Sequence, residues 1–131
     1  MSEHEQAFIA SFVVPEKRGR YAEFLARPGR RGEILDRWNH LFDFVPELAT
    51  TVPRSSPAEW AELLRRRGAP AGAYIMGGGL CDQSELPLAE AVERAWGSGW
   101  GVVVSCLPGR LALYLQESPA GAAFLLSART V

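Results

Sequence analysis

The sequence has few of the features that would identify an activity directly. Only two cysteines occur among the 131 residues, too few for a disulfide framework, and no C-x-x-C pair suggests a metal site. No apolar run approaches the roughly 18 residues that a membrane-spanning helix needs, and the acidic start of the chain lacks the pattern of a signal peptide. These absences predict a cytoplasmic protein without a membrane segment, a bound metal or a cofactor.

A strong charge of either sign is also missing. The formal net charge of -1 gives the whole protein no general attraction to nucleic acid or to acidic membranes. What is present is an ordinary globular composition, with 47% hydrophobic residues, four tryptophans, six phenylalanines and three tyrosines. Such a chain can form a hydrophobic core without disulfides, and we expect a single domain over residues 1–131.

Capping motifs and apolar periodicity predict five helices. Two S-x-x-E capping boxes, Ser2 with Glu5 and Ser56 with Glu59, start helices over residues 3–13 and over about residues 57–67. Periodicity adds one helix starting at residue 15, one over residues 34–42 and one starting near residue 87, with Trp96 on its apolar face. The helix over residues 34–42 has the clearest pattern. Its apolar face carries Ile34, Leu35, Trp38, Leu41 and Phe42, and its polar face carries Asp36, His40 and Asp43.

Apolar runs between turn signals predict the strands. They lie at about residues 48–52, 72–76, 100–106, 111–116 and 123–127, and the short turn at residues 107–110 makes the third and fourth an antiparallel hairpin. We therefore predict an α+β fold, in which a helical N-terminal half packs on a small, mostly antiparallel C-terminal sheet with one crossover helix. The last strand is a candidate free edge, so both a monomer and a homodimer are open.

Two segments resemble a group of small bacterial α+β proteins of unknown role. The first segment contains Val14, Pro15, Lys17, Arg18, Arg20 and Tyr21, followed by Arg30, Arg31 and residues 38–41. The second contains residues 86–91 and 105–112. The resemblance spans most of the chain and implies a small bacterial protein, but it carries over no catalytic residues.

A basic segment is the main candidate for an interaction surface. Residues 17–37 contain seven cationic and three anionic side chains, whereas residues 80–117 contain two cationic and five anionic ones. This asymmetry favours an accessory protein that presents an arginine-rich face to an acidic protein partner. The expected contact residues are Lys17, Arg18, Arg20, Arg30 and Arg31. A solvated face without a partner is the plainer interpretation, and nucleic acid is unlikely because no stacking platform is recognisable.

A run of three glycines after a predicted strand is the main candidate for a ligand site. Glycines in such a place can leave backbone N–H groups open to a phosphate, but this loop has no lysine, does not run directly into a helix and contains acidic residues. The alternative to an interaction protein is thus a small-molecule-binding domain or minor enzyme, with a pocket between residues 77–82 and the hairpin at residues 105–110. Its expected ligand-binding residues are Gly77, Gly78, Gly79, Asp82 and Arg110, with Cys81 and Ser105 as further polar groups. A simple turn is the competing interpretation.

The catalytic candidates are weak. His40 has Asp36 and Asp43 at helical spacing, which would orient an imidazole as a general base, but no nucleophile is evident nearby. Cys81 lies in a polar loop beside an aspartate, and Cys106 ends an apolar strand, so neither has the cationic surroundings of a reactive thiol. We expect binding rather than catalysis. We also expect Trp38, Trp60 and Trp96 in the core. Trp100 and Tyr114 lie on the predicted hairpin, where a place beside a groove is the alternative to the plainer interpretation of ordinary packing residues.

Overall fold

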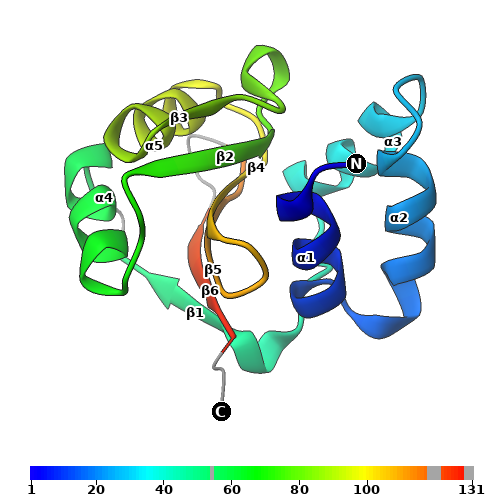
Figure 1. Ribbon diagram of the computed structural model, residues 1–131, viewed down its shortest axis with the longest axis horizontal. Coiled ribbons are helices and arrows are strands. Elements are labelled where there is room, and N and C mark those ends of the chain that lie inside the picture. The colour runs from blue at the N-terminus through cyan, green and yellow to red at the C-terminus, as the bar shows by residue number, and fades with distance from the viewer. Residues whose placement is uncertain (54, 118–121, 129–131) are drawn as a thin grey trace.

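A six-stranded antiparallel sheet forms the centre of the structure, with the strand order β1-β6-β5-β4-β2-β3 (Figure 1). The computed structural model describes residues 1–53, 55–117 and 122–128. The strands are β1 (Ala49–Val52), β2 (Gly72–Gly77), β3 (Glu85–Pro87), β4 (Val102–Leu107), β5 (Leu111–Leu115) and β6 (Ala123–Ser127). The helices are α1 (Glu3–Phe12), α2 (Arg18–Leu25), α3 (Arg31–Leu35), α4 (Pro57–Arg66) and α5 (Leu88–Gly97). The fold is therefore α+β, as the sequence predicts. The last strand is not a free edge, because β6 pairs with β1 on one side and with β5 on the other.

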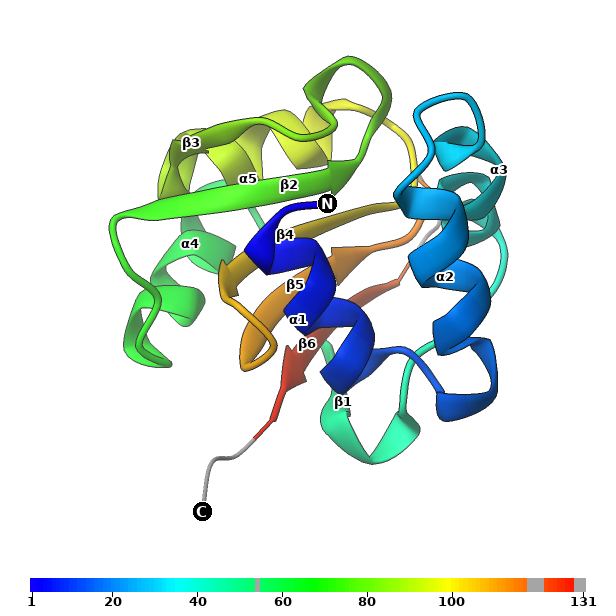
Figure 2. The ribbon, with the colours of Figure 1, turned by 45° about the vertical axis from the view of Figure 1, so that its right-hand side comes forward.

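The sheet lies between two helical layers. Helices α1, α2 and α3 cover one face, and α4 and α5 cover the other (Figures 1 and 2). Both faces of the central strands are consequently buried, which explains why residues 102–106 and 111–115 read as nearly continuous apolar runs. The sequence predicts two layers, helices on one face of a sheet, but the structure has three. The additional layer is formed by α4 and α5, which pack on the second face of the sheet against Ile75, Val102 and Val104.

Local signals place most of the elements correctly. The Ser56 hydroxyl accepts a hydrogen bond from the Glu59 N–H at 3.2 Å, and the Glu59 carboxylate accepts one from the Ser56 N–H at 3.3 Å. This reciprocal capping box starts α4 as predicted. The predicted crossover helix is α5. It connects β3 to β4, the two strands that flank β2 in the sheet. The short strand β3 is not predicted from the sequence, because it has only three residues, one of them a proline.

The third predicted helix is wrong over its second half. Helix α3 ends at Leu35, a 3-10 turn spans Asp36–Asn39, and Phe44 then forms an antiparallel bridge with Val13. Leu41 and Phe42 are exposed rather than in the core, and Asp43 is buried rather than on a polar face.

Long-range hydrogen bonds to Asp43 account for this break. Its carboxylate accepts from Lys17 at 3.0 Å, from the Tyr21 hydroxyl at 2.6 Å and from Arg37 at 2.7 and 3.1 Å. The Tyr21 hydroxyl in turn accepts from the Trp38 indole at 2.9 Å. A buried carboxylate with this many donors fixes the path of the chain more firmly than the apolar periodicity of the segment.

The surroundings of Asp43 also set its protonation. Burial pushes the pKa of Asp43 upward, but the hydrogen bonds from Arg37, Tyr21 and Lys17 outweigh burial and hold this pKa at about 2, below its ordinary 3.8. Burial, together with the Asp43 carboxylate, raises the pKa of Tyr21.

The helices give no sign of a membrane span. None of those in residues 1–53, 55–117 and 122–128 combines the length and the apolar character needed to cross a bilayer.

We predict an acid-sensitive contribution of Asp43 to stability. As the pH falls, the carboxyl group protonates first in the unfolded chain, so its stabilising effect is complete above the unfolded pKa of 3.8 and is lost as the pH falls toward about 2. Through this group the free energy of unfolding of the wild type should fall by about 2 kcal/mol. Chemical denaturation at several pH values should show this loss in the wild type but not in Asp43→Asn, which should already be destabilised at neutral pH. Asp36→Asn, which changes an exposed carboxylate, is the control, and an equal acid dependence in all three proteins would contradict the prediction.

Candidate functional site

The arginine-rich segment does not form one continuous exposed surface. Lys17 pairs with Asp43, and Arg18 donates to the carbonyl of Val13 at 2.7 Å. Arg20 is exposed, and Arg30 pairs with Glu33 while its guanidinium lies 4.1 Å from the centre of the Phe24 ring. Arg31 is buried and cannot be a surface contact, which corrects its place in the predicted face. Partner binding by the remaining cations stays a prediction.

Arg31 is the centre of a buried ionic network. Its guanidinium forks onto Glu5, with hydrogen bonds of 2.9 and 2.7 Å, and onto Asp82, with hydrogen bonds of 2.8 and 2.9 Å. A fifth bond, of 3.3 Å, reaches the carbonyl of Leu25. These contacts use all five donors of an arginine side chain. Burial alone would lower the pKa of Arg31, but its bonds to Asp82 and Glu5 raise it.

Each of the two carboxylates in this network accepts one further hydrogen bond. The Tyr74 hydroxyl donates to Glu5 at 2.6 Å, and the Gly77 N–H donates to Asp82 at 2.8 Å. Burial and the bond to Glu5 raise the pKa of Tyr74 to about 12. Glu5 therefore does not close the capping box expected from S-x-x-E. The Ser2 hydroxyl still accepts from the Glu5 N–H at 3.2 Å, but the Glu5 carboxylate turns inward to Arg31.

The network fixes one end of the glycine loop, which we define as residues 77–82. Gly77, Gly78 and Gly79 have φ values of 86°, 72° and 63°, a left-handed conformation that other residues rarely adopt. Close approach also requires glycine here, since a Cβ atom on Gly77 would lie 2.9 Å from the carbonyl oxygen of Gly101. Just beyond the loop, the Gln83 N–H donates to the carbonyl of Ile75 at 2.8 Å. The loop is therefore held by hydrogen bonds at both of its ends.

The structure does not form the predicted pocket between this loop and the hairpin. Strands β2 and β4 are antiparallel, with Gly77 opposite Val102 and Tyr74 opposite Ser105. The glycine loop therefore lies at the start of β4, whereas the hairpin lies at its far end. Gly77, Gly78, Gly79 and Asp82 come together as expected, but Arg110 belongs to the opposite end of the sheet.

The glycine loop instead separates two grooves. One, which we call the loop groove, has a volume of about 290 Å³ and is lined by Gly32, Leu35, Asp36, Asn39, Gly77, Gly78, Gly79, Asp82 and Trp100. The other, which we call the helix groove, has a volume of about 670 Å³ and is lined by Gly78, Leu80, Cys81, Ser84, Glu90, Glu93, Arg94, Gly97 and Ser98. Trp100 borders a groove, whereas Tyr114 is fully buried in the core and borders none of these grooves.

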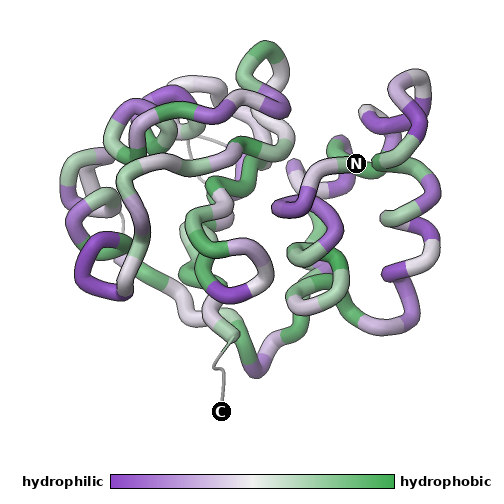
Figure 3. Tube along the Cα trace, in the orientation of Figure 1, coloured by the Kyte–Doolittle hydropathy of each residue, from purple (hydrophilic) through white to green (hydrophobic). Residues whose placement is uncertain are grey.

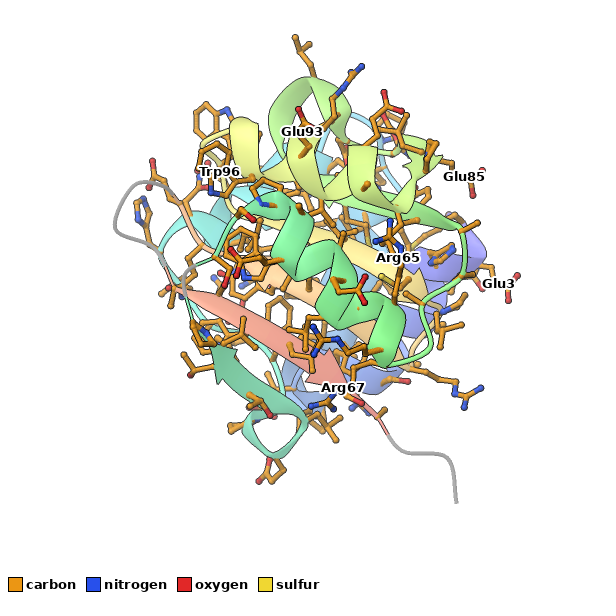
Figure 4. The ribbon with its side chains drawn as sticks, turned by 90° about the vertical axis from the view of Figure 1, so that its left-hand side faces the viewer. Glu3, Arg65, Arg67, Glu85, Glu93 and Trp96 are labelled. Carbon is orange, nitrogen blue, oxygen red and sulfur yellow. The ribbon has the colours of Figure 1, made fainter. Side chains whose placement is uncertain are left out.

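Large apolar side chains project around these grooves. Leu80 at the loop tip is fully exposed, at 106%, and Trp96 and Trp100 are exposed by 52% and 51%. The apolar tip of the loop stands out in Figure 3, and Figure 4 shows Trp96 and Glu93 on the outer side of α5. Trp96 is therefore not a core residue, because it lies in the last turn of α5, next to Gly97, and turns outward.

The rim of the grooves is acidic. Glu90 pairs with Arg94 at 3.3 Å, whereas Asp36 and Glu93 form no ion pair within the described parts of the chain. Asp82 already accepts two hydrogen bonds from Arg31. The loop surface, which we define as the two grooves with Leu80, Trp96 and Trp100, is thus apolar with a negative rim.

The catalytic candidates from the sequence do not assemble. His40 is exposed, and Asp43 faces Tyr21 instead of the imidazole. The Cys81 thiol donates to the Gly78 carbonyl at 3.1 Å, and burial raises its pKa. Burial raises the pKa of Cys106 to about 12. Neither cysteine is therefore a ready thiolate nucleophile.

One polar pair was missed by reasoning from the sequence. The His4 Nδ1 atom lies 2.7 Å from the Ser105 hydroxyl, and the His4 ring stacks on Tyr74 at a centroid distance of 5.3 Å. Burial lowers the pKa of His4. Ser105 is only 1% exposed, so its hydroxyl is not accessible to a substrate. The two residues are 101 positions apart, and no local motif connects them.

No family model, curated protein or solved structure matches this chain. Among the described residues, no group of three or more histidine, cysteine, aspartate or glutamate side chains is arranged to hold a metal ion.

We predict that Arg31→Lys destabilises the protein strongly. Lysine keeps the charge but cannot fork onto two carboxylates, so Glu5 and Asp82 would stay buried without enough donors. The free energy of unfolding, measured by chemical denaturation, should fall by about 3 kcal/mol. The control is Arg30→Lys, in which the exposed Arg30–Glu33 pair changes and the expected effect is below about 0.5 kcal/mol. Equal effects of the two substitutions would show that the buried network contributes little.

Proposed function

We propose that the protein is a non-enzymatic binding module of the bacterial cytoplasm that engages a polypeptide partner through the loop surface. The observation that carries this proposal is the exposure of Leu80, Trp96 and Trp100 around a loop that is fixed from within by Arg31. The resemblance of the sequence to small bacterial proteins supports the bacterial origin, and the scarcity of cysteines supports the cytoplasm.

The apolar side chains provide the binding energy. Burying a leucine side chain stabilises a complex by about 1.5–3 kcal/mol, and tryptophans are enriched among the residues that dominate interfaces. A fully exposed leucine at the tip of an ordered loop stabilises nothing within the chain itself. Its position is understandable if a partner covers it.

The rigid support of the loop lowers the cost of binding. Asp82 is held by Arg31 and by the Gly77 N–H, so the backbone beneath Leu80 is already ordered before a partner arrives. A preorganised loop loses little conformational entropy on binding, and more of the contact energy appears as affinity. This gives the buried network a functional purpose besides stability.

Charge indicates the kind of partner. Asp36, Glu90 and Glu93 border the grooves, and they would steer a basic segment toward the surface. This differs from the acidic partner expected on Lys17, Arg18, Arg20, Arg30 and Arg31. Four of these five side chains, all except Arg20, have internal acceptors. Binding of an acidic protein or of nucleic acid to the arginine-rich segment remains a separate, untested hypothesis.

Selection from a random-peptide display library tests the proposal directly. We expect the wild-type protein to select peptides whose binding is lost with Leu80→Asp and reduced at least tenfold with Trp100→Ala, a change of about 1.4 kcal/mol or more. Leu41→Asp changes an exposed leucine away from the loop surface and is the matched control, which should bind normally.

Circular dichroism and thermal unfolding of each variant would establish that it is folded. A library that yields no binders, or binders that are indifferent to both loop-surface substitutions, would overturn the proposal.

A further inference from the structure

We propose that the loop groove binds a guanidinium group, an arginine side chain of the partner polypeptide, between Trp100 and Asp36. This inference rests on the proposed function and specifies the group that the partner inserts. The groove has an aromatic side at Trp100, an acidic side at Asp36 and the backbone of the glycine loop between them.

The aromatic wall is the Trp100 side chain. The indole packs against the loop, because a Cβ atom on Gly79 would lie 3.5 Å from its Cδ1 and Nε1 atoms. Half of the side chain remains exposed toward the groove and the solvent. An indole face attracts cations more strongly than other aromatic rings, and a planar guanidinium can also stack on it.

The acidic wall is formed by the 3-10 turn at Asp36–Asn39. The Asn39 amide donates to Asp36 Oδ1 at 3.1 Å, and the Asn39 carbonyl oxygen accepts from the Gly101 N–H at 2.6 Å. Asn39 is therefore fixed from two sides and holds the Asp36 carboxylate in place. Asp36 Oδ2 has no hydrogen-bond donor within the described parts of the chain, so it can accept one from a ligand.

The other carboxylate of the groove is not available. Asp82 accepts two hydrogen bonds from Arg31 and one from the Gly77 N–H. Its charge is compensated by a guanidinium whose five donors are all in use, so Arg31 cannot serve an anionic ligand. Among the described residues that line the groove, one carboxylate is free and no cation is, which disfavours an anion and favours a cation.

A guanidinium fits this arrangement better than an ammonium. The groove of about 290 Å³ is open at its edge, and a planar group can lie against the indole while its N–H groups reach Asp36. An ammonium is a compact, strongly hydrated charge that cannot stack in this way. The neighbouring Leu80 would then contact an apolar residue next to the arginine in the partner.

The test uses nuclear magnetic resonance of the full chain labelled with nitrogen-15. The Trp100 indole N–H resonance, assigned from its loss in Trp100→Phe, is followed during titration with N-acetyl-arginine amide. We expect a saturable shift of this resonance, with weak millimolar affinity. The neutral isostere N-acetyl-citrulline amide should cause no comparable shift, and N-acetyl-lysine amide should bind several-fold more weakly.

Asp36→Asn should weaken binding of the arginine probe about five- to tenfold, the loss expected for one charge-assisted contact. The control Glu47→Gln removes an exposed carboxylate that lines neither groove and should leave the affinity unchanged. Equal affinity of arginine and citrulline, of arginine and lysine, or of wild type and Asp36→Asn would overturn the inference.

The outcomes separate this inference from the proposed function. If the arginine probe fails while library peptides still require Leu80, the binding module stands and the guanidinium assignment falls. If neither the probe nor the library shows binding, both fall. A third outcome concerns self-association. If the Trp100 resonance broadens with protein concentration in the absence of any probe, and Asp36→Asn removes this broadening, the groove binds an arginine of a second copy of the chain. That result would overturn the proposal of a separate partner.

Discussion

The buried guanidinium of Arg31 is the interaction on which the rest of this structure depends. It joins α1 through Glu5, α3 through its own backbone and the glycine loop through Asp82. Removing charges from water is costly, and the arrangement is stable because both carboxylates meet forked donors and because Tyr74 and Gly77 supply two more. The position of the loop, and with it the exposure of Leu80, follows from this one side chain.

The two faces of the sheet are stabilised in different ways. On the side of α4 and α5 the core consists almost wholly of apolar side chains, and α4 begins with a complete capping box. On the other side, α2 and α3 are shorter, with eight and five residues. Two polar centres, around Arg31 and Asp43, hold this layer together, and the Tyr74 hydroxyl of β2 joins the first of them to the sheet. Directional hydrogen bonds specify positions more sharply than apolar contact, so the more irregular layer is also the one whose geometry determines the loop surface.

Local signals predicted the fold, whereas long-range contacts determined the site. The capping box at Ser56 and the apolar runs of β4 and β5 involve neighbours in sequence, and these elements formed where they were expected. The partners of Asp43 and Arg31 are up to 51 residues away in the sequence. Helical periodicity therefore wrongly predicted Asp43 on a polar face, and the cluster of charges wrongly predicted Arg31 on the surface. The glycines and Asp82 were found because their pattern is local. The free acceptor on Asp36 and the exposure of Leu80 depend on tertiary contacts. The spacing of residues in the sequence does not reveal such contacts.

The ionic network around Arg31 has a consequence for how this chain folds. Glu5 and Asp82 lie 26 and 51 residues from the arginine to which both are hydrogen-bonded. A half-assembled network would leave a carboxylate buried without a cation, which costs several kcal/mol. The first turn of α1, the start of α3 and the glycine loop are therefore expected to become ordered together, as one cooperative unit. Local unfolding at the start of α1 would for the same reason release the loop more than seventy residues away, so the two regions should exchange their amide protons at similar rates.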